Sequence, residues 1–256
     1  MRYPEFLKEH GTIGFVAPSF GCAIEPYRTC FDSALQKFHD RGFATETGPN
    51  CYEGSGIGIS NTPQKCAEEL VEYYEKKSND ILISCGGGEL MCTILPYMDF
   101  ERVRRADPKW YMGYSDNTNF TFLLTTLCDV AALYGPCAAS FGMEPYHESL
   151  EDALAILQGK KQEVHSYPLW EKEKNKDEEH RLLPYHCTEP SALRGYDIPE
   201  VKGMDLSDHA GSGRKSIISP EKISDENLAQ KNAVIGKYEE ADHIRMKGRL
   251  LGGCMD

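Results

Sequence analysis

A serine stands where a strand is predicted to end and a helix to begin, in the sequence Gly113-Tyr114-Ser115-Asp116. Gly113 leaves room for a sharp turn, and Asn117 tolerates left-handed backbone dihedrals better than most residues. Such a turn would expose the Ser115 hydroxyl above a sheet. It would also place the Asp116 backbone N–H at a helix N-terminus, where it can donate to an oxyanion. The pattern is typical of a catalytic nucleophile, although a serine that caps an ordinary strand–helix turn has the same spacing.

A run of three glycines, residues 86–88, follows the apolar segment DILISC at residues 80–85. Nothing projects from a glycine, so this run could bring a second backbone N–H close to Ser115. A phosphate cradle is the alternative, but the run lacks both G-x-G-x-x-G and the G-x-x-x-x-G-K-[ST] pattern. Adjacent carboxylates at 68–69 and 177–179 lie on predicted helices or loops, where solvation accounts for them.

Short β-rich runs alternate with helical patterns over the first 140 residues, which predicts an α/β fold with a parallel sheet and helices on both faces. Residues 120–139 are the most apolar of the long stretches, but Asp129 and several threonines favour a helix and then a strand over a membrane span. The predicted strands are 12–17, 80–85, 109–114 and 131–134, and the predicted helices are 25–41, 63–77, 90–98, 117–127 and 147–157.

The character of the chain changes after about residue 145. Residues 160–180 carry mixed charge with little periodicity, which predicts a solvated loop or a solvated face. Residues 190–247 show no firm strand pattern, and the next predicted strand is 249–251. We therefore predict two regions: a nucleophile domain at 1–150, and a linker, insertion and start of a smaller β-rich domain at 151–256.

The composition excludes several classes of protein. The chain has 28 basic and 40 acidic residues among 256, for a net charge of −12, which argues against nucleic-acid binding and against an anionic membrane surface. No signal-peptide pattern begins the sequence. Ten cysteines include no C-x-x-C pair or zinc-finger spacing, so we expect buried free thiols and a cytoplasmic location.

Several stretches resemble the LD-carboxypeptidase family of serine peptidases, which includes the microcin-immunity proteins. They are GTIGFVAPS near the start, GGGELMCTILPYMDF in the middle, PKWYMGYSDNTNFTFLLTTLCDVAALYGP after it, and KGRLLGGCMD at the end. The third, with PK, G-Y-S-D-x-T and GP, is the most specific. The sequence TEPS at residues 188–191 and the long acidic insertion are more similar to the microcin-immunity branch of the family than to its murein-recycling branch.

The resemblance implies a Rossmann-like N-terminal domain and a smaller β-rich C-terminal domain with the active site between them. It places the nucleophile on Ser115 and the oxyanion donors on the backbone of Asp116, Gly87 and Gly88. It implies a metal-free Ser-Glu-His triad with no cofactor. The expected partner is a cell-wall-type peptide cleaved between an L-centre and a D-residue, or a microcin-like peptidyl adenylate. Self-association into a homodimer is left open.

The family's Glu and His follow the segment that KGRLLGGCMD resembles, and no residue here matches either of them. We therefore expect the C-terminal domain to be incomplete and the 256 residues by themselves to be nearly inactive, because a serine without a base is a weak nucleophile. The alternative function is a catalytically inactive remnant that binds a small ligand. The competing expectation is that an upstream histidine, such as His186 or His209, serves as the base.

Overall fold

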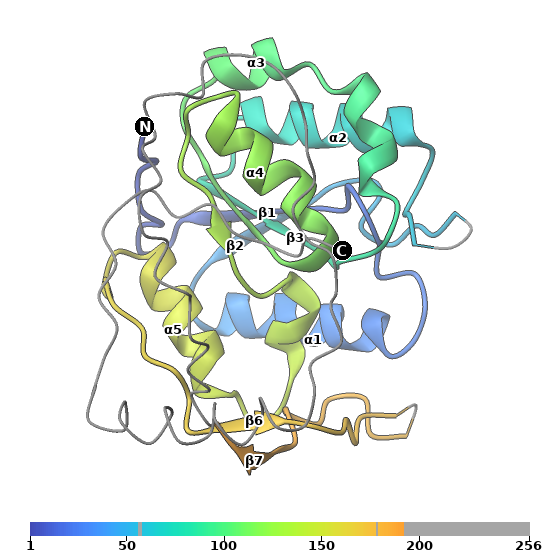
Figure 1. Ribbon diagram of the computed structural model, residues 1–256, viewed down its shortest axis with the longest axis vertical. Coiled ribbons are helices and arrows are strands. Elements are labelled where there is room, and N and C mark those ends of the chain that lie inside the picture. The colour runs from blue at the N-terminus through green and yellow to red at the C-terminus, as the bar shows by residue number, and fades with distance from the viewer. Residues whose placement is uncertain (56–57, 178, 192–256) are drawn as a thin grey trace, which may run out of the picture. The chain divides into compact units, whose positions relative to one another are not determined.

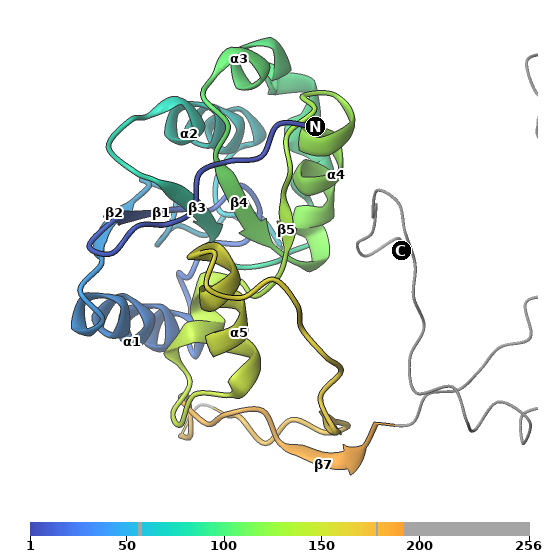
Figure 2. The same ribbon diagram turned by 90° about the vertical axis from the view of Figure 1, so that its left-hand side faces the viewer.

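Five parallel strands form the central sheet of the computed structural model, which describes residues 1–55, 58–177 and 179–191 (Figures 1 and 2). The sheet order is β2-β1-β3-β4-β5, and every neighbouring pair is parallel. Parallel strands end at the same edge of a sheet, so the loops that follow β1, β3, β4 and β5 lie close together. The strands are β1 Thr12–Val16, β2 Ala44–Thr47, β3 Ile81–Ser84, β4 Trp110–Gly113 and β5 Leu133–Tyr134.

Helices cover both faces of this sheet, as the sequence predicts. One face is covered by α1 (Tyr27–Asp40), the 3-10 helix η3 (Ala138–Gly142) and α5 (Glu148–Leu157). The other face is covered by α2 (Pro63–Glu75), η1 (Met91–Tyr97), α3 (Phe100–Arg105) and α4 (Thr118–Thr126). Figure 1 shows α2, α3 and α4 on the side of the sheet opposite α1 and α5. The α/β fold with a parallel sheet is therefore confirmed.

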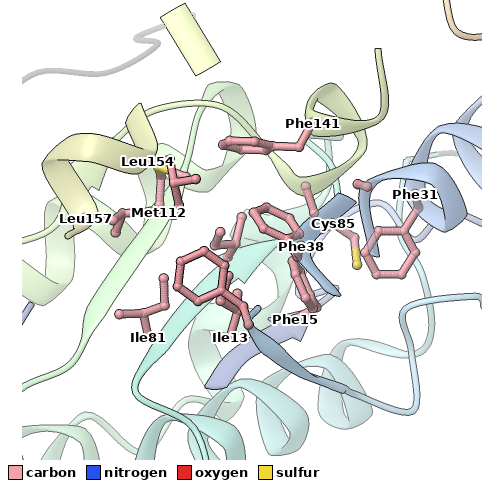
Figure 3. Packing of buried hydrophobic residues seen from close by; sticks show 14 of the residues in the cluster. Ile13, Phe15, Phe31, Phe38, Ile81, Cys85, Met112, Phe141, Leu154 and Leu157 are labelled. Atoms are coloured by element: carbon pink, nitrogen blue, oxygen red, sulfur yellow. The ribbon is translucent and has the colours of Figure 1, made fainter. Parts of the chain in front are cut away.

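The alternation of side chains along the strands explains why two layers of helices are needed. Ile81 and Ile83 of β3 pack toward α1 and α5, whereas Leu82 between them packs toward α2 and α4. Successive residues of a strand point to opposite faces, so a strand that is apolar throughout must be covered twice. Figure 3 shows Phe15 of β1 beside Phe38 of α1 within the first of these two cores.

The structure adds detail to one prediction about charged residues and corrects another. The described residues of 160–180 are exposed or partly exposed, as predicted, but they include a strand, β6 (Leu169–Glu171), that pairs antiparallel with β7 (Cys187–Pro190). The Glu69 carboxylate is not solvated: it is buried and accepts hydrogen bonds from the backbone N–H groups of Ala17 and Asn50, each at 2.8 Å. It therefore joins the loops that follow β1 and β2.

Several short elements differ from the sequence prediction. The strand β2 and the helix α3 are not foreseen, because β2 is a polar edge strand and α3 buries only Val103. Residues 90–98 form the 3-10 helix η1, which has Pro96 inside it, rather than an α-helix. The predicted strand at 249–251 lies outside the described residues, and the division into 1–150 and 151–256 stays a prediction.

Seven of the nine described cysteines are buried free thiols, as the sequence predicts. Burial raises the pKa of Cys51. In the unfolded chain this thiol ionises near its ordinary pKa of about 8.5, so above that pH the native state binds more protons and its free energy of unfolding falls. We expect Cys51→Ala to reduce this alkaline slope by up to about 1.4 kcal/mol per pH unit.

Urea unfolding between pH 8 and 10 measures that slope. Cys92→Ala is the matched control, because it removes a thiol from an exposed position rather than from the core. An equal slope in the Cys51→Ala and wild-type chains would contradict the prediction.

Candidate active site

Ser115 lies in the turn between β4 and α4, with a backbone φ of +59°. A left-handed conformation is uncommon in non-glycine residues and costs on the order of 1–3 kcal/mol, so the surrounding contacts must hold it. A 3-10 turn, η2 (Ser115–Asn117), leads directly from this residue into the helix. The strained residue is the serine itself rather than Asn117, whose φ is −62°.

The backbone of Ser115 is held by a residue from the next strand. The Ser115 N–H donates a hydrogen bond to the Tyr134 hydroxyl at 2.9 Å, and the Thr118 hydroxyl donates to the Ser115 carbonyl at 2.7 Å. Tyr134 is the last residue of β5 and is about half exposed. The left-handed serine is therefore tied on both sides of its own Cα.

The glycine run lies directly beside the serine. A Cβ atom built on Gly87 would be 3.2 Å from the Ser115 Cβ, so a side chain at Gly87 would crowd the hydroxyl. The Gly87 carbonyl accepts a hydrogen bond from the Phe20 N–H at 2.8 Å. Carbonyl and N–H point in opposite directions across a trans peptide, so the Gly88 N–H is directed away from Phe20. Within the described residues, neither the Gly87 nor the Gly88 N–H has an acceptor.

The Asp116 carboxylate joins three of the loops at this edge of the sheet. It accepts hydrogen bonds from the Ser19 hydroxyl, which follows β1, and from the Met91 N–H at 2.8 Å, which follows β3. The Asn119 side chain donates to it at 3.0 Å. Because Asp116 is the residue after Ser115, this network fixes the serine relative to both neighbouring loops.

Asn117 has a structural role beneath the turn. Its side-chain amide donates to the Gly86 carbonyl at 2.9 Å and accepts a hydrogen bond from the buried Tyr111 hydroxyl. A Cβ on Gly113 would approach the Asn117 side chain to 2.7 Å. Gly113 therefore allows the close approach that the sequence pattern predicts.

Ser115 opens into a cleft of about 730 Å³. The walls differ in chemistry: Leu95, Phe122 and Leu123 are apolar, whereas Glu89 and Asp116 are acidic. No lysine, arginine or histidine lines this cleft in the part of the chain that the structure describes. Gly88, Cys92, Thr118 and Asn119 complete the lining.

The structure brings together the four predicted site residues, which are Gly87, Gly88, Ser115 and Asp116. It does not place a general base beside them among the described residues. His186, one of the two candidates, contacts the Glu173 carbonyl and has no hydrogen bond to Ser115. None of the other described histidines is hydrogen-bonded to Ser115 either, and His209 lies outside the described residues. Among the described residues, no group of three or more His, Cys, Asp or Glu side chains is placed to hold a metal ion.

Sequence reasoning missed Ser19, Tyr134 and the carboxylate role of Asp116. Their contacts join residues from different strands, so only the order of strands in the sheet could have indicated them. Ser19 follows the predicted strand 12–17, and Tyr134 ends the predicted strand 131–134. Position at the carboxyl end of a strand is therefore the sequence signal that could have found both residues.

Comparison with known proteins identifies relatives of the part of the chain that holds this site. Residues 13–135 match the family model of the LD-carboxypeptidase N-terminal domain. The chain is 32% identical over 151 residues to a Vibrio cholerae protein provisionally named a carboxypeptidase, covering 57% of this chain and 43% of that protein. It is 28% identical over 164 residues to the microcin C7 self-immunity protein MccF of Escherichia coli, covering 63% and 47%. The chain thus spans about half the length of these curated relatives.

Solved structures show the same fold. The structure of MccF in complex with glutamyl sulfamoyl guanosine has a TM-score of 0.64 at 23% identity, covering 73% of this chain and 57% of that one. An MccF-like protein from Bacillus anthracis has a TM-score of 0.56 at 24% identity, covering 62% and 47%. Residues 13–135 are therefore identified as an LD-carboxypeptidase N-terminal domain by the family match and the sequence relatives, and the solved structures show the fold alone.

Proposed function

We propose that Ser115 is the nucleophile of a serine hydrolase that cleaves an amide bond in a cell-wall-type peptide or a microcin-like peptidyl adenylate. The left-handed Ser115 between Gly87 and the cleft is the observation that carries this proposal. A strained serine at a strand–helix turn is typical of enzymes that must present a hydroxyl above a sheet.

In the proposed reaction, the Ser115 oxygen attacks the carbonyl carbon of the scissile amide while a base accepts the hydroxyl proton. The negative charge that develops on the carbonyl oxygen is stabilised by the N–H groups of Asp116 and of Gly87 or Gly88. The proton passes to the leaving amine, and water then hydrolyses the acyl-enzyme ester. No described residue is placed as the base, so His209 is the candidate to test.

The choice of substrates rests on the relatives. One relative is named a microcin C7 self-immunity protein, and structures of it contain glutamyl sulfamoyl guanosine or aspartyl sulfamoyl adenosine. Another relative is provisionally named a carboxypeptidase. Both substrate classes contain a carbonyl group next to a leaving group, which is what a serine nucleophile requires.

A second candidate function is ligand binding without turnover. The observation that favours it is the lack of a base hydrogen-bonded to Ser115 among the described residues. A serine hydroxyl without a base is a poor nucleophile, although the cleft and the backbone donors could still bind a carbonyl group.

Release of D-alanine from a tetrapeptide ending in L-lysyl-D-alanine separates the two candidates. The control substrate is the diastereomer ending in L-lysyl-L-alanine. Hydrolysis is supported by release from the first peptide and not from the second. Binding of the first peptide without any release would favour the second candidate, and His209→Ala then shows whether turnover, where present, depends on that residue.

Tyr134→Phe is expected to lower turnover about 10- to 100-fold, with a much smaller change in KM. The substitution removes the oxygen that accepts the Ser115 N–H at 2.9 Å, so the serine is less firmly held in its strained conformation. Tyr97→Phe is the matched control, because Tyr97 is also about half exposed but does not contact Ser115. A kcat for Tyr134→Phe equal to that of Tyr97→Phe would contradict the positioning role.

The remaining expectations are proposed with the function. Buried free thiols among the described cysteines support a reducing, cytoplasmic location, and the net charge of −12 supports a small-molecule partner rather than a nucleic acid. Within the described residues, no helix has the length and apolar character needed to cross a membrane. Whether the chain forms a homodimer is a question for sedimentation.

A further inference from the structure

A second cavity, of about 350 Å³, is lined by Gly86 and Gly87 of the glycine run, whereas the Ser115 cleft is lined by Gly88. We call it the lysine pocket, because Lys174 and Lys176 line it together with Tyr27, Gly87, Tyr114 and Tyr185. The segment that supplies the lysines follows β6, and the other walls come from the start of α1 and from the turns after β3 and β4. Its volume is near the lower end of the roughly 300–1,000 Å³ range of small-molecule sites, which suits one small residue.

The lysine pocket and the Ser115 cleft differ in charge. Two lysines and one carboxylate, Glu171, line the lysine pocket, and Glu171 accepts a hydrogen bond from the His186 N–H at 2.9 Å. The described lining of the Ser115 cleft has two carboxylates and no cation. An anionic group is therefore attracted to the lysine pocket and repelled from the cleft.

The ammonium group of Lys176 is directed into the pocket. Its Nζ atom lies 3.8 Å from the Cys30 sulfur, which also lines the cavity. Burial raises the pKa of Cys30, so this thiol stays neutral and does not offset the lysine charge; Glu171 is the carboxylate in the lining. Burial likewise raises the pKa of Tyr114, whose hydroxyl is 3.1 Å from that of Ser140 at the pocket wall. Both hydroxyls are protonated at neutral pH and able to donate.

The two cavities are lined by neighbouring residues at the nucleophile. Gly87 lines the lysine pocket, and a Cβ built on it would lie 3.2 Å from the Ser115 Cβ; Tyr114, which also lines the pocket, is the residue before Ser115. Ser115 itself lines the cleft. A scissile amide placed at the Ser115 hydroxyl would thus have one side in the larger acidic and apolar cleft and the other in the smaller pocket.

We propose that the lysine pocket binds the C-terminal residue of the peptide substrate and that Lys174 and Lys176 bind its free carboxylate. This inference rests on the proposed function, because it assigns the leaving side of the same amide bond. The remainder of the peptide occupies the Ser115 cleft, whose Glu89 suits a cationic group such as a free amine. A free carboxylate is what distinguishes the end of a peptide from its interior, so this contact would restrict cleavage to the last residue.

Binding to the Ser115→Ala chain, which cannot turn the ligand over, tests the inference by titration calorimetry. The two probes are the tetrapeptide ending in L-lysyl-D-alanine and the same peptide with a C-terminal carboxamide. We expect the free acid to bind at least about 10-fold more tightly than the amide. The added double substitution Lys174→Met/Lys176→Met should weaken the free acid about 10- to 100-fold and the amide less than about 3-fold.

Lys172→Met is the matched control, because Lys172 is exposed in the same segment but does not line the pocket; it should leave both affinities unchanged. The Lys174→Gln/Lys176→Gln pair, with a thermal melt of each chain, guards against a loss of folding. Equal affinities for acid and amide, equal weakening of both, or no binding of either would overturn the inference. Adenosine monophosphate is a third probe. If its binding depends on Lys174 and Lys176 as strongly as that of the free-acid peptide, the pocket is a phosphate site and the inference is overturned.

These results are independent of catalysis. If the Ser115→Ala chain binds the free acid selectively through the lysines but the wild type releases no D-alanine, the lysine pocket is supported and the hydrolase function is contradicted. If the wild type releases D-alanine but the Ser115→Ala chain binds acid and amide equally, the hydrolase function is supported and the lysine pocket is contradicted.

Discussion

Ser115→Ala is expected to lower whatever D-alanine release the wild-type chain shows by at least about 10³-fold, because only binding and the backbone donors remain when the nucleophile is removed. If the 256 residues lack a base, as the sequence predicts, neither chain releases D-alanine. The folded state should survive the change. The Ser115 side chain is half-buried at the cleft, and the contacts that hold its backbone, from Tyr134 and Thr118, do not involve its hydroxyl. Alanine has no larger steric conflict at a φ of +59° than serine has.

Labelling with a fluorophosphonate should disappear together with turnover, since the probe reacts with the same hydroxyl. Ser78→Ala is the control: this serine is exposed, bonds Glu46, and precedes β3 at the far end of the strand. It should retain wild-type turnover and labelling. A Ser115→Ala chain that keeps turnover within 10-fold of wild type would show that another residue is the nucleophile.

Gly88→Ala is expected to lower turnover at least about 10²-fold and to destabilise the fold by about 2–4 kcal/mol. Gly88 has a φ of +152°, a region that residues with a side chain rarely adopt. An added Cβ would collide with the Ser19 hydroxyl and would lie 2.6 Å from the Gly58 carbonyl oxygen. Relief of that collision must move Ser19, which bonds the Asp116 carboxylate, or the Gly88 N–H, which is a proposed oxyanion donor.

Gly54→Ala is the matched control, because its Cβ would meet only the Ala23 Cβ, at 3.1 Å, and Gly54 has no positive φ. It should change turnover less than about 3-fold. Turnover and urea unfolding are measured for both variants. A Gly88→Ala chain with wild-type kcat would contradict the assignment of this glycine to the oxyanion site, even if its stability were lower.

Most of the fold follows from local patterns in the sequence. The run DILISC has three consecutive branched apolar residues, 81–83, and such a run predicts a strand covered on both faces. Pro63 after Thr62 predicts a helix start, and the Thr62 side chain accepts the Lys65 N–H in the structure. The polar edge strand β2 has no such pattern, because pairing with β1 on one side is what makes it a strand.

Part of the site was predictable for the same reason. Gly113 and Ser115 on a strand–helix turn form a short motif, and the glycine run ends the neighbouring strand of the sheet. The sequence predicts that both lie at the carboxyl edge. It does not predict which of Ser115 and Asn117 has the left-handed backbone, since that depends on the bond from Ser115 to Tyr134.

The sequence by itself determined the α/β class and the parallel sheet covered on both faces, because these depend on periodicity along the chain. The set Gly87, Gly88, Ser115 and Asp116 is a prediction from spacing and from the family resemblance. The tertiary structure alone decided that Asp116 bonds Ser19, that Tyr134 holds Ser115, and that Glu69 is buried between two loops. It also decided that the lysines after β6 lie next to the glycine run. Each of these contacts joins segments at least 19 residues apart in the sequence. The order of the strands and the packing of the loops, rather than the neighbouring residues in the chain, determine which side chains meet across such a separation.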